Sequence, residues 1–287
     1  MYTTLITPEQ LHALQQAGTP VVVCDVSFSL DQPALGAQQF ADTHIAGAIY
    51  VHLDEHLSSH NPATAASGGR HPLPSREEFA QTLQQLGVRN GVQVVVYDRN
   101  GCNYCGRLWW MLQWLGHGAV AILDGGLQAW QQAGLPTASG APAYSATSSP
   151  FMVQAPLVQL VSRATVQADL GSPRRTLIDS RGAPRYRGEV EPLDPVAGHI
   201  PGALNRMFSD NLADNGRFKS ADTLRQEFDT LLGQTSSDNI TVYCGSGVSA
   251  VPNFVALRLA GFDNIGLYAG SWSDWCTAQP ALPVERG

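Results

Sequence analysis

The sequence predicts an α/β protein that contains two copies of one domain. Four short motifs occur twice in the same order, and short apolar runs alternate with helical patterns along the chain. The length of 287 residues suits two domains of about 130 to 140 residues, each large enough for its own core. These observations favour two tandem α/β domains over one larger domain.

The repeats place the domain boundaries. The offset between copies is about 145 to 155 residues. A nearly uncharged segment rich in Pro, Ala, Ser and Thr, between Gly134 and Pro156, separates them. We therefore predict a first domain at 1–137, a linker at 138–157 and a second domain at 158–287. The matched segments are 21–25 with 176–181, 44–48 with 199–203, 94–98 with 240–244, and 125–130 with 270–275.

Strand and helix patterns alternate within each copy. The apolar, β-branched runs are typical of strands that are buried on both faces. Thr7 and Pro8 predict a helix start, and Pro252 fits the first turn of a helix. The expected strands are 21–24, 93–97, 120–123, 176–178, 239–243 and 265–268, and the expected helices include 75–86, 107–115 and 221–232.

The segment Thr241–Ala250 carries the clearest chemical signal. An apolar strand ends on Cys244, and a loop of small residues then leads into a helix. Loop amides and the positive end of a helix favour an anionic sulfur and lower the pKa of a thiol. Cys244 is therefore the expected nucleophile, against the alternative of an inert, buried cysteine. The first copy has Asp98 at this position and lacks the nucleophile.

Together these motifs resemble the rhodanese superfamily, specifically its tandem-domain sulfurtransferases. The resemblance rests on the Cys244–Ser249 loop, on His-Ile-x-Gly-Ala at 44–48 and 199–203, on the Trp109-Trp110 helix and on Leu123–Gly126. It implies two rhodanese-like domains, each a central parallel sheet flanked by helices. It also implies that Cys244 takes a sulfane sulfur, holds it as a persulfide and passes it to an acceptor.

The resemblance also implies roles for other residues. Ser246 matches a serine that acts with a histidine and an aspartate, here His71 and Asp54, in a proton relay. The alternative is that His71 is a loop residue and Asp54 a helix cap. Arg185 matches the arginine that binds the donor, and Arg187 is a weaker candidate. The loop residues expected to hold the sulfur or the substrate are Gly245, Gly247, Val248, Ser249 and Ala250.

The sequence indicates two candidate sulfur donors, 3-mercaptopyruvate and thiosulfate. The neutral Gly245-Ser246 pair resembles 3-mercaptopyruvate sulfurtransferases, whereas thiosulfate enzymes tend to have Arg-Lys there. However, Leu193 stands where a second substrate arginine is expected. Sulfur transfer from 3-mercaptopyruvate to a thiol or cyanide leads, and thiosulfate:cyanide transfer is the alternative. A non-catalytic sulfur-binding module and a cysteine-dependent phosphatase rank lower, the latter because Ala250 replaces its phosphate-binding arginine.

Two further cysteine and histidine patterns have several explanations. Cys102 and Cys105 form a single Cys-x-x-Cys, which could be a redox switch, half a zinc site or a chance pair. His52, His56 and His60 would share one face if a helix ran through them. We expect no metal site from either pattern.

Composition limits the partners. The net charge of −7, without a run of Lys or Arg, argues against nucleic acid as a partner. No apolar run is long enough to cross a membrane, and the N-terminus lacks signal-peptide features. The five cysteines do not form a disulfide framework. We expect a cytoplasmic protein that uses no cofactor. Its expected donor is a small molecule that carries sulfur, and its expected acceptor is a thiol, cyanide or a thioredoxin-like protein.

Overall fold

The computed structural model describes residues 1–144, 146–233 and 239–287, so Ser145 of the predicted linker lies outside the described residues. The chain forms two compact units. Most of unit 1 comes from the first half of the sequence and most of unit 2 from the second half. Unit 1 contains Met1–Ser59, Pro74–Leu157 and Asp214–Arg217, and unit 2 contains His60–Leu73, Val158–Ala213 and Phe218–Gly287.

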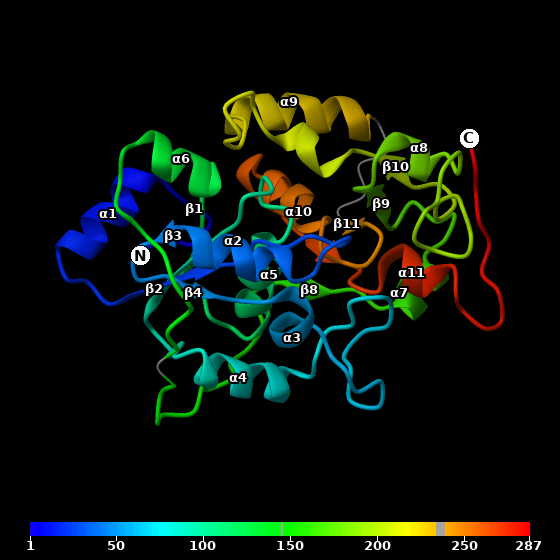
Figure 1. Ribbon diagram of the computed structural model, residues 1–287. Coiled ribbons are helices and arrows are strands. Elements are labelled where there is room, and N and C mark those ends of the chain that lie inside the picture. The colour runs from blue at the N-terminus through cyan, green and yellow to red at the C-terminus, as the bar shows by residue number, and fades with distance from the viewer. Residues whose placement is uncertain (145, 234–238) are drawn as a thin grey trace. The chain divides into compact units, whose positions relative to one another are not determined.

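Unit 1 is built on a five-stranded sheet in the order β1-β6-β5-β2-β4. All of its paired strands are parallel (Figure 1). The central strand β5 is buried along its whole length, as its Val-rich sequence predicts. The strands are β1 (Leu5–Ile6), β2 (Val21–Asp25), β4 (Ile49–Tyr50), β5 (Gln93–Tyr97) and β6 (Val120–Leu123).

Helices cover this sheet, and α5 packs against β5 and β6. Thr7 and Ser75 begin α1 and α4 with capping boxes, in which side chain and backbone satisfy each other's end groups. Every residue of α5 is buried, including Trp109, Trp110 and Trp114. The remaining elements are α1 (Pro8–Gln16), α2 (Leu35–Asp42), β3 (His44–Ile45), α3 (Leu53–Leu57), α4 (Arg76–Gln85), α5 (Cys105–Trp114), α6 (Gly126–Gln132) and β7 (Thr137–Ala138).

Unit 2 has a second five-stranded parallel sheet, in the order β10-β9-β11-β12-β8. Strand for strand, this order equals that of unit 1 when the elements are counted along the chain. The structure therefore confirms the predicted α/β fold with a central parallel sheet in each copy. The strands are β8 (Gln159–Leu160), β9 (Thr176–Asp179), β10 (Leu204–Asn205), β11 (Ile240–Tyr243) and β12 (Ile265–Leu267).

The helices of unit 2 position the end of β11. Helix α10 packs against β11 and β12, and α9 packs on α10 (Figure 1). Pro252 lies in the first turn of α10, as predicted, where the missing N–H breaks no helical hydrogen bond. The helices are α7 (Arg163–Ala168), α8 (Ala183–Tyr186), the 3₁₀ helix η1 (Phe208–Asn211), α9 (Ala221–Leu232), α10 (Val251–Leu259) and α11 (Ser271–Trp275).

The repeated His-Ile-x-Gly-Ala motif has the same anchor in both units. In unit 1 the hydroxyl of Tyr97, the last residue of β5, accepts a hydrogen bond from the Ile45 amide at 3.1 Å. In unit 2 the hydroxyl of Tyr243, the last residue of β11, accepts one from the Ile200 amide at 3.2 Å. The motif is therefore used to fasten a loop to the central strand.

Two details differ from the sequence analysis. Helix α3 ends at Leu57, so His60 lies outside it, and the helical alignment of His52, His56 and His60 does not occur. His52 instead caps α3 by accepting from the amides of Asp54 and Glu55. The two-residue edge strands β1, β4, β8 and β10 were not predicted, since they are too short to give a periodic pattern.

The described residues contain neither a disulfide nor a membrane-spanning helix. All five cysteines are free thiols, in line with the absence of a disulfide framework. Among the described residues, no helix combines the length and the apolar character that crossing a membrane requires.

Candidate active site

Cys244 lies directly after β11, at the carboxyl end of the central strand of unit 2, and is 2% exposed. Its backbone N–H donates to Ser271 Oγ at 3.1 Å, and its carbonyl accepts from the Trp272 amide at 3.0 Å. Ser271 has a positive φ of 55°, which is rare for a residue other than glycine. The backbone at Cys244 is therefore held by the segment that begins α11.

The loop after Cys244 offers a row of backbone donors. The amides of Gly245, Ser246, Val248, Ser249 and Ala250 donate to no acceptor within the described parts of the chain. They precede the first turn of α10, where the helix end also carries partial positive charge. Unpaired amides at such a position form a binding site for an anion.

In unit 1, the amides of the equivalent loop bind a carboxylate. Asp98 follows β5 as Cys244 follows β11, and its carboxylate is 1% exposed. It accepts hydrogen bonds of 2.8 to 3.0 Å from four amides. A strand–loop–helix of this shape thus binds a negative charge in one copy. The four donors are the amides of Asn100, Cys102, Tyr104 and Cys105.

Two glycines give the Cys244 loop its shape and leave space beside it. Gly247 has φ of 74°, and a Cβ there would lie 2.2 Å from the Ala269 carbonyl oxygen. A Cβ on Gly245 would lie 3.1 Å from Arg70 Nη2 and 3.5 Å from Arg185 Nη1. Gly247 is required by the backbone conformation. Gly245 has no side chain, so the guanidinium groups of Arg70 and Arg185 can lie next to the loop.

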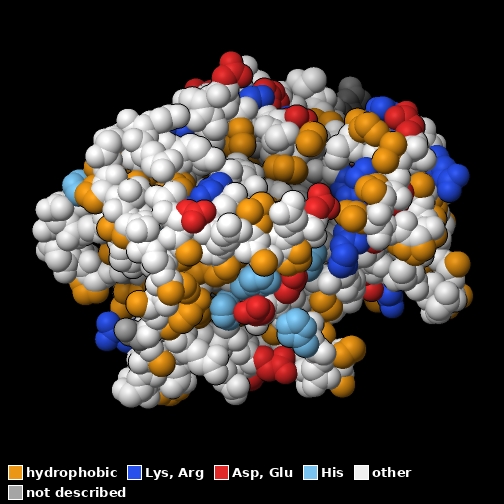
Figure 2. All heavy atoms as spheres, viewed as in Figure 1, with side chains coloured by type: hydrophobic (Ala, Val, Ile, Leu, Met, Phe, Trp, Pro, Cys, Tyr) orange, Lys and Arg blue, Asp and Glu red, His pale blue; other side chains and the backbone are white. Residues whose placement is uncertain are grey.

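Arg70 and Arg185 each have donors that remain free. Arg70 Nη1 is bound to Asp194 at 2.6 Å, and Arg185 Nη2 to Glu191 at 2.6 Å and to Asp194 at 3.2 Å. Arg70 Nε and Nη2 and Arg185 Nη1 have no acceptor within the described residues. Several basic side chains gather on the face of unit 2 that Figure 2 shows. Two free guanidinium edges beside the cysteine loop fit a carboxylate or another oxyanion.

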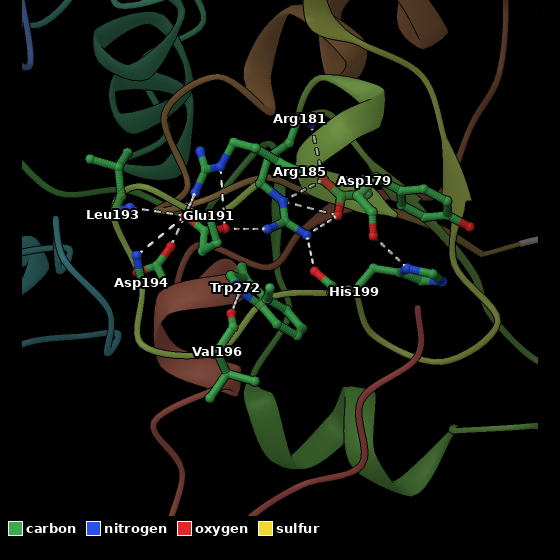
Figure 3. Close-up of polar contacts among 12 residues, drawn as sticks. Asp179, Arg181, Arg185, Glu191, Leu193, Asp194, Val196, His199 and Trp272 are labelled. Atoms are coloured by element: carbon green, nitrogen blue, oxygen red, sulfur yellow. Dashed lines mark hydrogen bonds and ion pairs between the residues drawn. The ribbon is translucent and has the colours of Figure 1, made fainter. Parts of the chain in front are cut away.

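A chain of ion pairs continues behind Arg185 (Figure 3). Glu191 also binds Arg181 at 3.2 Å, and Arg181 binds Asp179 at 2.7 Å. Burial by itself would lower the pKa of Arg181, but the carboxylates of Asp179 and Glu191 raise it, so this guanidinium stays charged. Arg181 and Asp179 are both buried, and this pair therefore supports the site from within the core.

His71 and Ser246 are hydrogen-bonded, with 2.7 Å between His71 Nδ1 and Ser246 Oγ, and both side chains are buried. His71 belongs to unit 2, since residues 60–73 group with the second half of the chain. Asp54 lies in α3 of unit 1. The predicted contact between Ser246 and His71 is present, and the part of Asp54 in a relay stays a prediction.

The other predicted site residues lie as follows. Val248 and Ala250 are buried, and Ser249 is partly buried in the same loop. The Arg187 side chain is 42% exposed and pairs with Glu189 at 2.7 Å, so its role as a substrate ligand stays a prediction. Leu193, at the position of the expected second arginine, is 43% exposed and turns its side chain away from Glu191 (Figure 3).

The Cys-x-x-Cys motif lies in unit 1, in the loop that binds Asp98. Cys102 and Cys105 are buried, and their amides donate to the Asp98 carboxylate. Burial, a hydrogen bond with Cys102 and the charge of Asp98 raise the pKa of the Cys105 thiol. The motif therefore helps to build this loop, and the raised pKa keeps the Cys105 thiol protonated.

Sequence reasoning missed three residues of this site: Arg70, Asp194 and Ser271. Arg70 directly precedes His71, so its closeness to Ser246 could have been inferred once His71 was placed. Ser271 aligns with Gly126 of the first copy, which has φ of 59°, and the repeat alignment could have signalled its backbone. Asp194 gave no such signal, because its contact with Arg70 spans 124 residues of sequence.

This chain is similar to known proteins of one family over almost its whole length. The model of the rhodanese-like domain matches residues 7–133 and 162–278. A protein from Pseudomonas aeruginosa, described as a probable 3-mercaptopyruvate sulfurtransferase, is 45% identical over 284 residues, which are 99% of this chain and 98% of that protein. SseB of Mycobacterium tuberculosis, described as a putative thiosulfate sulfurtransferase, is 41% identical over 287 residues, or 99% of this chain and 97% of that protein.

A solved structure agrees with these sequence matches. The crystal structure of SseA from Escherichia coli, described as a 3-mercaptopyruvate sulfotransferase with the rhodanese fold, superimposes with a TM-score of 0.79 at 30% sequence identity. The superposition covers 95% of this chain and 100% of that chain. The matched residues of the family model lie in both units, and the second match at 162–278 includes the Cys244 loop.

Proposed function

The chain belongs to the rhodanese-like family, and on this basis we propose that it is a sulfurtransferase that takes sulfur from 3-mercaptopyruvate onto Cys244. One observation carries the proposal. Cys244 lies beside a row of unpaired backbone amides. At the equivalent position of unit 1, the Asp98 carboxylate accepts hydrogen bonds from four backbone amides. A thiolate, and then a persulfide, is the anion that this loop would hold.

The proposed step is a displacement at sulfur. The Cys244 thiolate attacks the sulfur of 3-mercaptopyruvate, an S–S bond forms, and the bond from sulfur to carbon breaks. The electron pair of that bond goes to carbon, which gives the enolate of pyruvate. The proton of the donor thiol ends on this carbon, so the products are pyruvate and the Cys244 persulfide anion. Attack by a thiolate on sulfur is the chemistry of thiol–disulfide exchange.

Ser246 and His71 are placed to move that proton. Their hydrogen bond of 2.7 Å lies in the loop that directly follows Cys244. A hydroxyl that is paired with an imidazole can give a proton and regain it near neutral pH. We propose Asp54 as the third member, which would hold His71 in the required tautomer.

Arg70 and Arg185 are the proposed ligands of the donor carboxylate. Their free N–H groups lie next to Gly245, one residue after the nucleophile. A planar carboxylate can accept two parallel hydrogen bonds from such groups. In this proposal Arg70 takes the task of the arginine that Leu193 replaces. The loop residues Gly245, Gly247, Val248, Ser249 and Ala250 would surround the transferred sulfur. The unpaired amides of this loop would donate hydrogen bonds to it.

Thiosulfate is the second candidate donor. The relative from Mycobacterium tuberculosis is named for it, and two guanidinium groups can also bind a sulfonate. With thiosulfate the thiolate would take the outer sulfur, and sulfite would leave with the bonding electrons. Gly245 and Ser246 add no positive charge for a dianion, which favours 3-mercaptopyruvate.

The acceptor would be cyanide or a thiol, with a thioredoxin-like protein as one candidate. A thiol acceptor would receive the outer sulfur and return Cys244 to the thiolate. We propose the cytoplasm as the location, since free thiols persist and thiol acceptors are abundant in a reducing compartment.

Steady-state assays with both donors and cyanide as acceptor test the proposal. We expect a higher kcat/KM with 3-mercaptopyruvate than with thiosulfate, and loss of thiocyanate formation in Cys244→Ser. Cys276→Ser, at a half-buried thiol outside the loop, is the matched control and should retain activity. Equal or better use of thiosulfate would overturn the choice of donor, and an active Cys244→Ser enzyme would overturn the mechanism.

A further inference from the structure

We propose that Asp194 sets the charge of the donor site and thereby selects a monoanionic donor over a dianionic one. The inference rests on the proposed function and adds a specificity residue to it. Asp194 lies next to the exposed Leu193, in the segment between α8 and β10.

Asp194 joins the two donor-site arginines. One of its carboxylate oxygens binds Arg70 Nη1 at 2.6 Å, and the other binds Arg185 Nη2 at 3.2 Å. The Asp194 side chain is 4% exposed, so water screens this charge little. The carboxylate therefore binds one nitrogen of each guanidinium group and leaves Arg70 Nε and Nη2 and Arg185 Nη1 without an acceptor among the described residues.

The ion pairs around Asp194 balance one another. Arg70, Arg185 and Arg181 contribute three positive charges, and Asp194, Glu191 and Asp179 contribute three negative charges. Figure 3 labels the members of this network other than Arg70. The described network thus has no net formal charge before a donor enters. Its free N–H groups still give directional hydrogen bonds, which a single carboxylate can satisfy.

A second negative charge on the donor changes this balance. 3-Mercaptopyruvate brings one carboxylate, whereas thiosulfate is a dianion with charge on both ends. This network has no net positive formal charge to balance the additional one, which is repelled by Asp194 behind Arg70 and Arg185 and by Glu191 behind Arg185. Asp194 therefore lowers the affinity for a dianion more than for a monoanion.

Asp194→Asn tests this inference, because it removes the charge and retains the shape and one acceptor oxygen. The measured quantity is kcat/KM with thiosulfate divided by kcat/KM with 3-mercaptopyruvate. We expect this ratio to rise about tenfold, the size expected for a unit charge near a partly screened site.

Three further variants separate charge from geometry and from misfolding. Asp194→Glu keeps the charge and should keep the wild-type ratio. Asp229→Asn removes a carboxylate from an exposed ion pair with Arg225 in the same unit and should also keep it. Leu193→Lys adds a positive charge at an exposed position beside Asp194 and should raise the ratio about threefold.

The outcomes are separable from those of the proposed function. A wild-type enzyme that uses neither donor would refute the function itself. An active wild type, with an unchanged ratio in folded Asp194→Asn and in Leu193→Lys, would refute only the role of Asp194. An equal rise in Asp194→Glu would show that position and not charge matters, and would also refute it. Should Asp194→Asn fail to fold, the ratio of Leu193→Lys decides.

Discussion

At the scale of single residues, the site depends on backbone positions that few side chains tolerate. Gly247 and Ser271 both have positive φ values, and they lie on the two segments that surround Cys244. The sequence predicted Cys244, Ser246, His71 and Arg185 because short motifs contain them. It did not predict Asp194, because only the folded chain brings this carboxylate to Arg70.

Gly247→Ala should destabilise the protein more than an ordinary glycine replacement does. The positive φ alone costs an alanine roughly 1–2 kcal/mol. The Cβ would also lie 2.2 Å from the Ala269 carbonyl oxygen, and such overpacking adds about 1–3 kcal/mol. Urea unfolding, monitored for unit 2, measures the sum.

Gly261→Ala is the matched control for this prediction. Gly261 has φ of 78°, close to the 74° of Gly247, but a Cβ there would meet nothing within 4 Å. This variant should show only the conformational cost. Equal losses of stability in the two variants would contradict the close approach of Gly247 to Ala269.

At the scale of elements, one motif of a strand, a loop and a helix occurs twice. The residue that follows the strand is Asp98 in the first copy and Cys244 in the second. The order and type of these elements were predicted from apolar runs and from the repeat. Edge strands of two residues were not, because their pairing is set by neighbouring strands and not by their own sequence.

Asp98→Asn should loosen the first copy of this loop. The carboxylate accepts four amide hydrogen bonds, whereas an asparagine side chain has one oxygen, and its NH₂ group would face amides that also donate. We expect the opening free energy of the loop to fall by about 2 kcal/mol. Hydrogen exchange of the amides at 100–105 measures this, with the exposed Asp31→Asn as control. Unchanged exchange would show that the carboxylate does not hold the loop.

The segment after α5 should make unit 1 sensitive to acid. His117 is buried against Phe151, and burial lowers its pKa from 6.5 despite hydrogen bonds with Val92 and Ala119 that raise it. Below pH 6.5 the unfolded chain binds the proton more tightly than the folded chain. Stability is therefore full above pH 6.5 and falls as the pH drops from there through the lowered folded pKa.

A pH series of unfolding measurements tests this on the wild type and on His117→Gln. The free energy of unfolding should fall less in the variant than in the wild type as the pH drops below 6.5, because glutamine does not titrate. His60→Gln, at an exposed position, is the control and should leave the pH profile unchanged. An identical pH profile in wild type and His117→Gln would exclude His117 as the cause.

At the scale of the whole molecule, the chain repeats one fold and gives its two copies different chemistry. Two sheets of equal strand order confirm what the four repeated motifs predict. The grouping of residues 60–73 with unit 2 could not be read from the sequence, because those residues precede the linker by many positions. This grouping places Arg70 and His71 at the Cys244 loop, where we propose that the donor binds.

Intact mass spectrometry of the protein after exposure to each donor, without acceptor, tests the central claim most directly. We predict that 3-mercaptopyruvate adds the mass of one sulfur atom, that fragmentation places it on Cys244, and that cyanide removes it. The loss of this addition in Cys244→Ser, with Cys276→Ser unchanged, would complete the result. An unmodified Cys244 after treatment with both donors, or a sulfur bound to another cysteine, would contradict the account.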